Sequence, residues 1–168
     1  MVNTLLTGQV KRIGELLKSR GETIAVAESS TGGLISASLL ALPGASAYFQ
    51  GGSVVYTLAS RRELLRITAA DVEGLHPLSE PMVRQFARHA RLQLGTTWGL
   101  AELGAAGPTG TRYGHAAGTS VLAVDGPVTM SITVQTGSDD REANMWQFTA
   151  RALTLLESVL REPEARNP

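Results

Sequence analysis

A cluster of three hydroxyl side chains, Ser29, Ser30 and Thr31, follows a short apolar stretch and precedes two glycines. The apolar stretch predicts a strand and the residues after the glycines predict a helix, which puts the hydroxyls where that helix begins. The first turn of a helix has unpaired N–H groups that attract a phosphate or a developing oxyanion. One interpretation is therefore a nucleophilic or anion-binding site, with Gly32 and Gly33 letting backbone approach the ligand. Simple capping of the helix by Ser30 or Thr31 is the alternative.

A second glycine-rich segment, residues 107–118, contains Arg112 and His115. It lacks the Gly-Lys-Ser/Thr ending of a nucleotide-hydrolase P-loop, and the only lysines of the chain are Lys11 and Lys18. Arg112 is a candidate contact for a phosphate or carboxylate and His115 is a candidate base, with a solvated surface position as the alternative for each. The chain has no cysteine, and no histidine pair has the spacing of a metal site, so we expect no metal.

A nucleophilic serine needs a group that accepts its proton. The G-x-S-x-G pattern of many serine hydrolases is missing, and a Ser-Lys dyad would require a lysine from the first helix. Tyr56, at the end of the second predicted strand, and Arg61, in the following helix, converge on Ser29 if the first two strands are neighbours. An aromatic residue packed on the sheet and a solvated arginine are the alternative interpretations.

The elements that would position these residues alternate between helix and strand. Periodicity and turn residues predict helices over 3–20, 34–42, 60–66, 79–94 and from 140 onwards, and strands over 23–27, 49–56, 98–106, 119–124 and 128–136. An Asp-Gly pair joins the last two strands as a hairpin. We therefore predict a three-layer α/β/α sandwich with a mixed, mostly parallel sheet. Both glycine-rich segments follow strands, where such sheets bind ligands.

Composition narrows the functional classes. The chain has 168 residues, of which 43% are hydrophobic and 18% charged, with formal net charge +0. We expect a single domain over residues 1–168. A balanced charge without a basic cluster argues against nucleic acid as an obligatory partner. The first residues do not resemble a signal peptide and no stretch is long enough to span a membrane, so a cytoplasmic protein without a membrane partner is expected.

Five motifs occur in a characteristic order: A-E-S-S-T-G-G at 27–33, Q-G-G-S-V-V-Y-T at 50–57, P-L-S-E at 77–80, G-A-A-G-P-T-G at 104–110 and A-G-T at 117–119. This series resembles the CinA C-terminal domain family, which includes stand-alone nicotinamide mononucleotide deamidases. The resemblance implies a three-layer α/β/α domain, commonly a homo-oligomer. It also implies hydrolysis of a small-molecule nucleotide substrate, nicotinamide mononucleotide, to nicotinic acid mononucleotide and ammonia, with no metal or other cofactor.

The resemblance also implies roles for individual residues. Ser29 corresponds to the nucleophile, Tyr56 to a proton shuttle and Arg61 to an electrostatic partner. In the family interpretation a serine at a helix N-terminus has N–H donors nearby for the tetrahedral oxyanion. The residues expected to bind substrate are Glu28, Ser30, Thr31, Gly32, Gly33, Gly52, Ala106, Gly107, Arg112 and Arg141.

Four positions depart from the family pattern. Leu58 replaces an asparagine, Leu103 replaces a threonine, and Met145 lies where the family has a second arginine. Arg61 replaces a lysine, and arginine keeps the positive charge but cannot release its proton. Two interpretations therefore stay open: a serine amidohydrolase acting on nicotinamide mononucleotide or a related amide, and a non-catalytic relative that binds a nucleotide or a protein partner.

Overall fold

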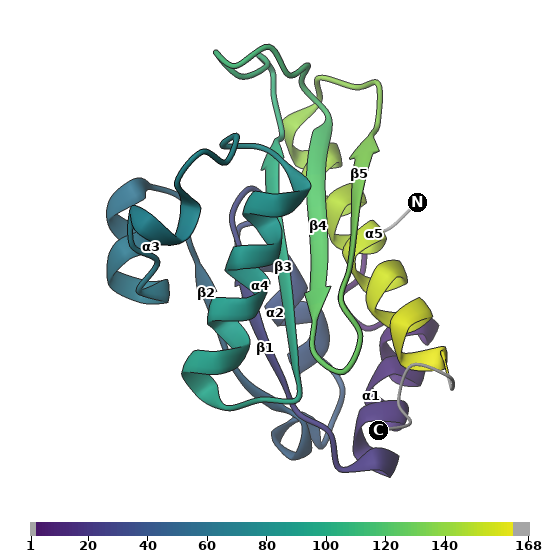
Figure 1. Ribbon diagram of the computed structural model, residues 1–168. Helices are drawn as coiled ribbons and strands as arrows, with labels where there is room; N and C mark the ends of the chain where they lie inside the picture. The colour runs from purple at the N-terminus through teal and green to yellow at the C-terminus, as the bar shows by residue number, and fades with distance from the viewer. Residues whose placement is uncertain (1–2, 163–168) are drawn as a thin grey trace.

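A five-stranded sheet in the order β2-β1-β3-β4-β5 forms the centre of the protein (Figure 1). The computed structural model describes residues 3–162. Its elements are α1 (Gly8–Arg20), β1 (Ile24–Glu28), α2 (Leu34–Leu40), β2 (Phe49–Val54), α3 (Leu58–Leu65), α4 (Glu80–Leu94), β3 (Trp98–Ala105), β4 (Thr119–Asp125), β5 (Met130–Gln135) and α5 (Arg141–Arg161), with short 3-10 helices at Ala45–Ala47 and Ala70–Val72.

The sheet is mixed, as the sequence predicts. β1 pairs in parallel with both β2 and β3, whereas β4 runs antiparallel to β3 and to β5. All strands except β4 therefore point the same way, and the small-residue strand β3 lies at the centre. The carboxyl ends of β1, β2 and β3 meet at one edge of the sheet, because parallel neighbours end on the same side.

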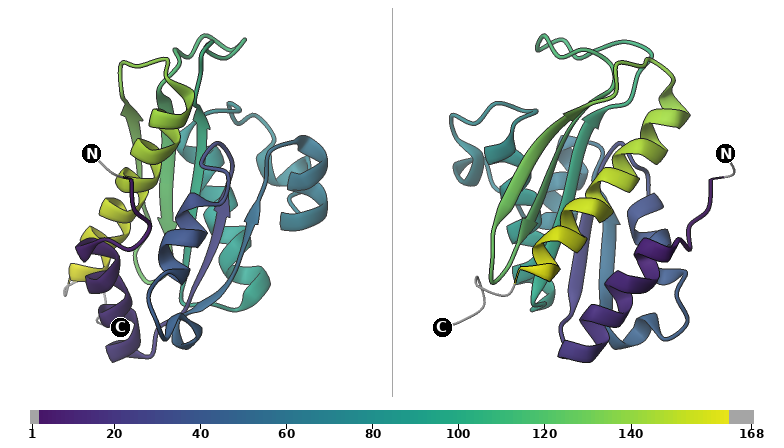
Figure 2. Two further views of the ribbon diagram at one scale, coloured as in Figure 1. Left: turned by 180° about the vertical axis from the view of Figure 1, so that it is seen from behind. Right: turned by 90° about the vertical axis from the view of Figure 1, so that its right-hand side faces the viewer.

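Helices cover both faces of the sheet, which confirms the three-layer prediction (Figure 2). α1, α2 and α5 pack on one face, α4 packs on the other, and α3 extends beyond the β2 edge (Figure 1). Neighbouring residues of β3 serve the two cores: Leu100 is buried with Phe148 on the α5 side, and Ala101 is buried with Val83 on the α4 side. Within residues 3–162, no helix is long and apolar enough to cross a membrane.

Two element boundaries differ from the sequence prediction because capping hydroxyls set them. The first helix begins at Gly8, where the side chain of Thr7 accepts a backbone N–H of the first turn. α3 begins at Leu58 because Thr57 forms a capping box. β2 has already ended at Val54, so Tyr56 lies on the loop between β2 and α3 rather than in a strand.

Candidate functional site

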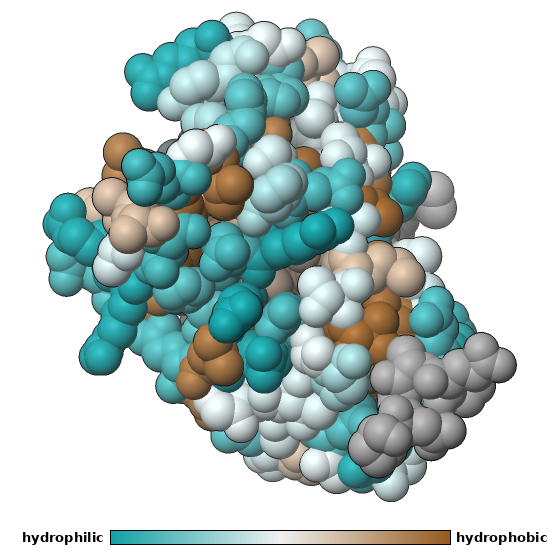
Figure 3. Space-filling view, viewed as in Figure 1, coloured by the Kyte–Doolittle hydropathy of each residue, from teal (hydrophilic) through white to brown (hydrophobic). Residues whose placement is uncertain are grey.

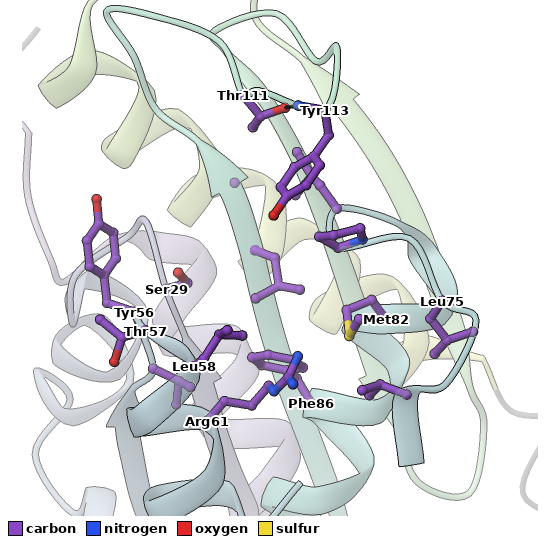
Figure 4. Close-up of a pocket in the computed structure, with 16 residues that line it drawn as sticks. Ser29, Tyr56, Thr57, Leu58, Arg61, Leu75, Met82, Phe86, Thr111 and Tyr113 are labelled. Carbon is purple, nitrogen blue, oxygen red and sulfur yellow. Dashed lines mark hydrogen bonds between the residues drawn. The ribbon is translucent and has the colours of Figure 1, made fainter. Parts of the chain in front are cut away.

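A cavity of about 430 Å³ lies at the carboxyl edge of the sheet, between α3, α4 and the segment that joins them. We call it the apolar cavity, because most of its wall is hydrocarbon, including Leu58, Leu75, Met82, Phe86 and Leu103 (Figure 4). In the space-filling view, brown apolar atoms show in the hollow beside α3 (Figure 3). Three of the four departures from the family pattern, Leu58, Arg61 and Leu103, line this cavity.

The three proposed catalytic residues all line the apolar cavity. Ser29 follows β1, and Tyr56 and Arg61 reach the cavity from the segment after β2, which is the parallel neighbour of β1. Arg61 extends from α3 toward Phe86 (Figure 4), and its Nε is buried with no hydrogen-bond partner among the described residues. The Ser29 hydroxyl likewise forms no hydrogen bond within residues 3–162. The site thus holds a free hydroxyl and an unsatisfied cationic donor.

A smaller polar pocket of about 180 Å³ adjoins the apolar cavity. Its wall includes Ser30, Ala106, Gly107 and Arg141, and it shares Tyr56 with the apolar cavity. The Arg141 guanidinium donates from Nη1 to the Gly107 carbonyl at 2.6 Å and from Nη2 to the Tyr56 hydroxyl at 3.2 Å. These hydrogen bonds hold α5, the glycine-rich segment and the β2–α3 loop around one pocket.

The start of α2 is not open to a ligand, which corrects the sequence expectation. Glu28 is 1% exposed, and its carboxylate accepts the backbone N–H groups of Gly33, Ile35 and Ser36 at 2.8, 3.1 and 2.9 Å. These are the donors expected to meet an oxyanion or phosphate. Glu28 therefore caps α2 from inside the protein and lines neither the apolar cavity nor the polar pocket.

Glu102 of β3 is a second buried carboxyl at this turn, and the sequence reasoning missed it. It accepts the N–H groups of Ser29 and Thr31, both at 3.0 Å, and the hydroxyl of Ser30. Burial raises the pKa of the Glu102 carboxyl above its ordinary value, although these hydrogen bonds oppose the rise. The available signal was an acidic residue inside the otherwise uncharged strand W-G-L-A-E-L-G-A-A.

Several predicted substrate contacts lie outside both hollows. Thr31 is fully buried, and Gly33 donates to Glu28 rather than to open space. Gly52 lies in β2, where a Cβ would come within 2.4 Å of the Ser36 hydroxyl, so its role is close packing. Gly32 has φ +63°, and a Cβ there would approach the Met145 methyl at 3.1 Å. Met145 thus packs against residues 29–33, which we call the serine turn.

The second glycine-rich segment contributes Gly107 to the polar pocket, as predicted, but neither Arg112 nor His115 lines a hollow. Arg112 lies outside both hollows and donates to the Tyr113 hydroxyl at 3.0 Å, while Tyr113 and Thr111 line the apolar cavity. His115 packs edge-on against His76 with ring centroids 4.9 Å apart. Among the described residues, no group of three or more His, Cys, Asp or Glu side chains is arranged to hold a metal ion.

Comparison with known proteins identifies the family. The model of the CinA C-terminal domain matches residues 7–160. The chain belongs to the CinA C-terminal domain family. It is 42% identical over 115 residues to a CinA-like protein of Acaryochloris marina, covering 68% of this chain and 27% of that protein. A CinA-like protein of Anaeromyxobacter sp. is 37% identical over 145 residues, covering 86% of this chain and 36% of that protein.

Solved structures of the CinA superfamily share the fold over almost the whole chain. The competence damage-inducible protein A from Klebsiella pneumoniae superposes with a TM-score of 0.85 at 26% identity, covering 92% of this chain and 96% of that one. A CinA superfamily protein from Enterobacter cloacae gives 0.85 at 27% identity, covering 95% of each. This chain therefore spans most of these CinA structures but only about a quarter to a third of the longer CinA-like relatives.

Proposed function

We propose that this CinA-family chain is a serine amidohydrolase that converts nicotinamide mononucleotide, or a closely related amide, to the acid and ammonia. One observation carries the proposal: Ser29, with a free hydroxyl, lines the same cavity as Tyr56 and the unsatisfied Nε of Arg61. A nucleophile, a group able to pass a proton and a fixed positive charge are the parts that acyl transfer requires.

The two adjoining hollows suit the two ends of such a substrate. A flat ring bearing the carboxamide fits the apolar cavity, whose wall includes Met82 and Phe86. A phosphate fits the polar pocket, where Arg141 brings a positive charge. Tyr56 lines both hollows, so it lies where the ring end of the substrate meets its charged end.

The reaction balances with these residues alone. Ser29 Oγ bonds to the carboxamide carbon while its proton passes to the Tyr56 oxygen, and Tyr56 gives its own proton to the nitrogen. The C–N bond then breaks, ammonia leaves and an acyl-serine ester remains. Water adds to the ester carbon and returns one proton through Tyr56 to Ser29 Oγ, which releases the carboxylic acid. Arg61 offsets negative charge on the reacting oxygen.

The oxyanion donor differs from the one expected at the helix start. Glu28 and Glu102 occupy most N–H groups of the turn, but the N–H of Ser30 has no hydrogen-bond partner within residues 3–162. It belongs to the residue after the nucleophile, a position that supplies an oxyanion donor in other serine hydrolases. We assign it this role, with Arg61 as the second donor.

The test is ammonia release from nicotinamide mononucleotide by the purified protein beside Ser29→Ala. We expect turnover by the wild type and loss of at least about 10³-fold in the variant, because the nucleophile is removed. Ser53→Ala is the matched control, since Ser53 lies on β2 away from both hollows and should leave turnover unchanged. Equal activity of wild type and Ser29→Ala would refute the assignment.

A non-catalytic nucleotide-binding relative is the second candidate, and the arginine at position 61 favours it. Arginine cannot accept the serine proton. If the wild type releases no ammonia but nicotinamide mononucleotide raises its Tm, the chain binds without hydrolysing. Arg61→Lys then separates the two candidates further, because restored turnover would show that one substitution removed the activity. Self-association, also predicted for this family, is measured on the same samples by light scattering.

A further inference from the structure

Two buried carboxyls, those of Glu28 and Glu102, lie beneath the serine turn and contact the same Thr31 hydroxyl. Glu28 and Glu102 occupy paired positions on the neighbouring strands β1 and β3, and their exposures are 1% and 0%. Within residues 3–162, neither has an ion-pair partner. Two carboxylates held together without a cation do not both stay ionised, because each charge disfavours the other.

The hydroxyl of Thr31 bridges the two carboxyls. Thr31 Oγ1 lies 2.7 Å from Glu28 Oε1 and 2.9 Å from Glu102 Oε2, which are both hydrogen-bond distances. A hydroxyl has one hydrogen and donates to only one of these oxygens. The other contact needs a hydrogen from a carboxyl. The geometry is satisfied when the pair holds one proton.

The surroundings of the two groups differ in a way that locates this proton. Besides Thr31, Glu28 accepts three backbone N–H groups and the hydroxyl of Ser36, so its charge is well compensated. Glu102 accepts two backbone N–H groups and the hydroxyl of Ser30, one N–H fewer than Glu28, and its complete burial raises the pKa of this carboxyl. The proton therefore belongs mainly to Glu102.

We propose that Glu28 and Glu102 share one proton at neutral pH, and that Glu102 in its neutral form is a positioning residue for the nucleophile Ser29. Glu102 does not line either hollow, so it acts through the Ser29 N–H that it accepts. Loss of the proton at alkaline pH leaves two buried carboxylates side by side. Their repulsion loosens the turn and moves Ser29 away from its position in the cavity wall.

Charged and titratable groups around the pair are few. From β4, Ser120 approaches Glu102 Oε1 at 3.5 Å, and from α5 the Phe148 ring packs with Ser30 and Glu102 around Gly104. The ionisable side chains of Tyr56 and Arg141 line the polar pocket together with Ser30, whose hydroxyl donates to Glu102. No histidine contacts either carboxyl within the described chain, so a titration at this turn reports the glutamate pair.

The shared proton is tested without any assumption about activity. Infrared spectra of the wild type at neutral pH should contain the carbonyl band of a buried protonated carboxyl, and Glu102→Gln should lack it. The band should vanish as the pH is raised. Its absence from the wild type at neutral pH overturns the proposal, and this result needs no variant to fold. Ser120→Ala is the matched control: it removes a neighbouring hydroxyl and should keep the band.

Thermal unfolding gives a second reading. A raised pKa in the folded state means that stability is complete below the unfolded value and falls as the pH rises through the folded value. Glu102→Gln is permanently neutral and cannot show that fall. The Tm of Glu102→Gln minus the Tm of the wild type should therefore increase by at least about 3 °C between mildly acidic and alkaline pH. A constant difference would contradict the inference.

The positioning role rests on the proposed function and is measured as a pH profile with nicotinamide mononucleotide. Wild-type kcat should fall about tenfold or more at alkaline pH, and Glu102→Gln should lose this decline while Ser120→Ala retains it. The same decline in Glu102→Gln refutes the positioning role. If the wild type releases no ammonia, the proposed function fails, and the infrared and Tm readings still decide whether the proton is shared.

Discussion

Two glutamates of this protein, Glu102 under the serine turn and Glu157 between α1 and α5, are both largely buried but have opposite electrostatics. Glu157 accepts hydrogen bonds from Arg12, Arg161 and Gln9 at 2.7, 2.8 and 2.9 Å, and these contacts lower its pKa to about 2. Glu102 has hydroxyl and N–H neighbours but no cationic partner among the described residues, and burial raises its pKa. Burial alone therefore does not decide the charge of a carboxyl.

The difference matches where each group lies. Glu157 joins two helices on one outer layer, where guanidinium side chains reach it from solvent. Glu102 lies inside the central strand β3, level with the end of β1, where a cation would need space that Ser30 and Phe148 fill. The contacts of Glu157 hold α1 and α5 together, whereas Glu102 keeps a proton beside the nucleophile Ser29. Substitutions at and around the two glutamates separate these two uses of the same side chain.

The largest expected effect comes from Gly104→Ala, which places a methyl group beside Glu102. A Cβ at this position would lie 2.5 Å from Ser30 Oγ, 2.8 Å from Glu102 Oε1 and 2.9 Å from Phe148. We expect the free energy of unfolding to fall by about 3 kcal/mol, because all three neighbours are packed and buried. Chemical denaturation measures the loss.

Gly8→Ala is the matched control near Glu157. A Cβ there meets only Arg12 Nη1, at 3.5 Å, and position 8 opens a helix that favours alanine. We expect no loss of stability, and a gain of up to about 1 kcal/mol. Similar losses for the two variants would show that the space around Glu102 is no tighter than the surface.

The contrast also explains how far the sequence predicts this molecule. Helix ends depend on local signals, so Gly21, Ser79, Gly95 and Asp140 correctly mark boundaries through left-handed or capping conformations. Strands are recognised in the sequence as short apolar runs bounded by turn residues, and this pattern predicts the strands of the sheet. The prediction that Tyr56 and Arg61 lie near Ser29 needs one further condition, that β1 and β2 are adjacent in the sheet. The two strands are adjacent.

The electrostatics of the turn could not be predicted in the same way. Ser29 and Glu102 are 73 positions apart in the chain, and no local pattern states which side chain will accept an N–H. The same holds for Glu157, which meets Arg12 across 145 positions. Helix-capping rules favoured the hydroxyls of the turn as caps, whereas Glu28 reaches the start of α2 from the preceding strand. Longer side chains from strand ends thus override local capping preferences.

An intermediate effect is expected from Glu157→Gln, and it appears at the acidic end of the pH range. The lowered pKa means that the stabilisation is present above the ordinary value of 4.5 and is lost as the pH falls through about 2. We expect the variant to be less stable by about 1 kcal/mol at neutral pH, since its two arginine partners are half exposed. Urea unfolding at neutral pH and below the lowered pKa measures the difference.

The direction of this change with pH distinguishes the two glutamates. The gap between wild type and Glu157→Gln should close on acidification, whereas the gap between wild type and Glu102→Gln should change on the alkaline side of the ordinary carboxyl range. A Glu157→Gln gap that stays constant down to the lowest pH would mean that the glutamine disturbs packing rather than removing a charge.

Replacing either arginine that pairs with Glu157 is expected to have the smallest effect on stability. The hydrogen bond from Arg12 is the largest cause of the lowered pKa, and the bond from Arg161 contributes less. Arg12→Gln should therefore raise the pKa of Glu157 further above about 2 than Arg161→Gln does. Carboxyl NMR titration measures both values. Equal rises would show that the carboxylate responds to total nearby charge, whereas a larger rise for Arg12→Gln would show that the direct Nε hydrogen bond separates this glutamate from Glu102.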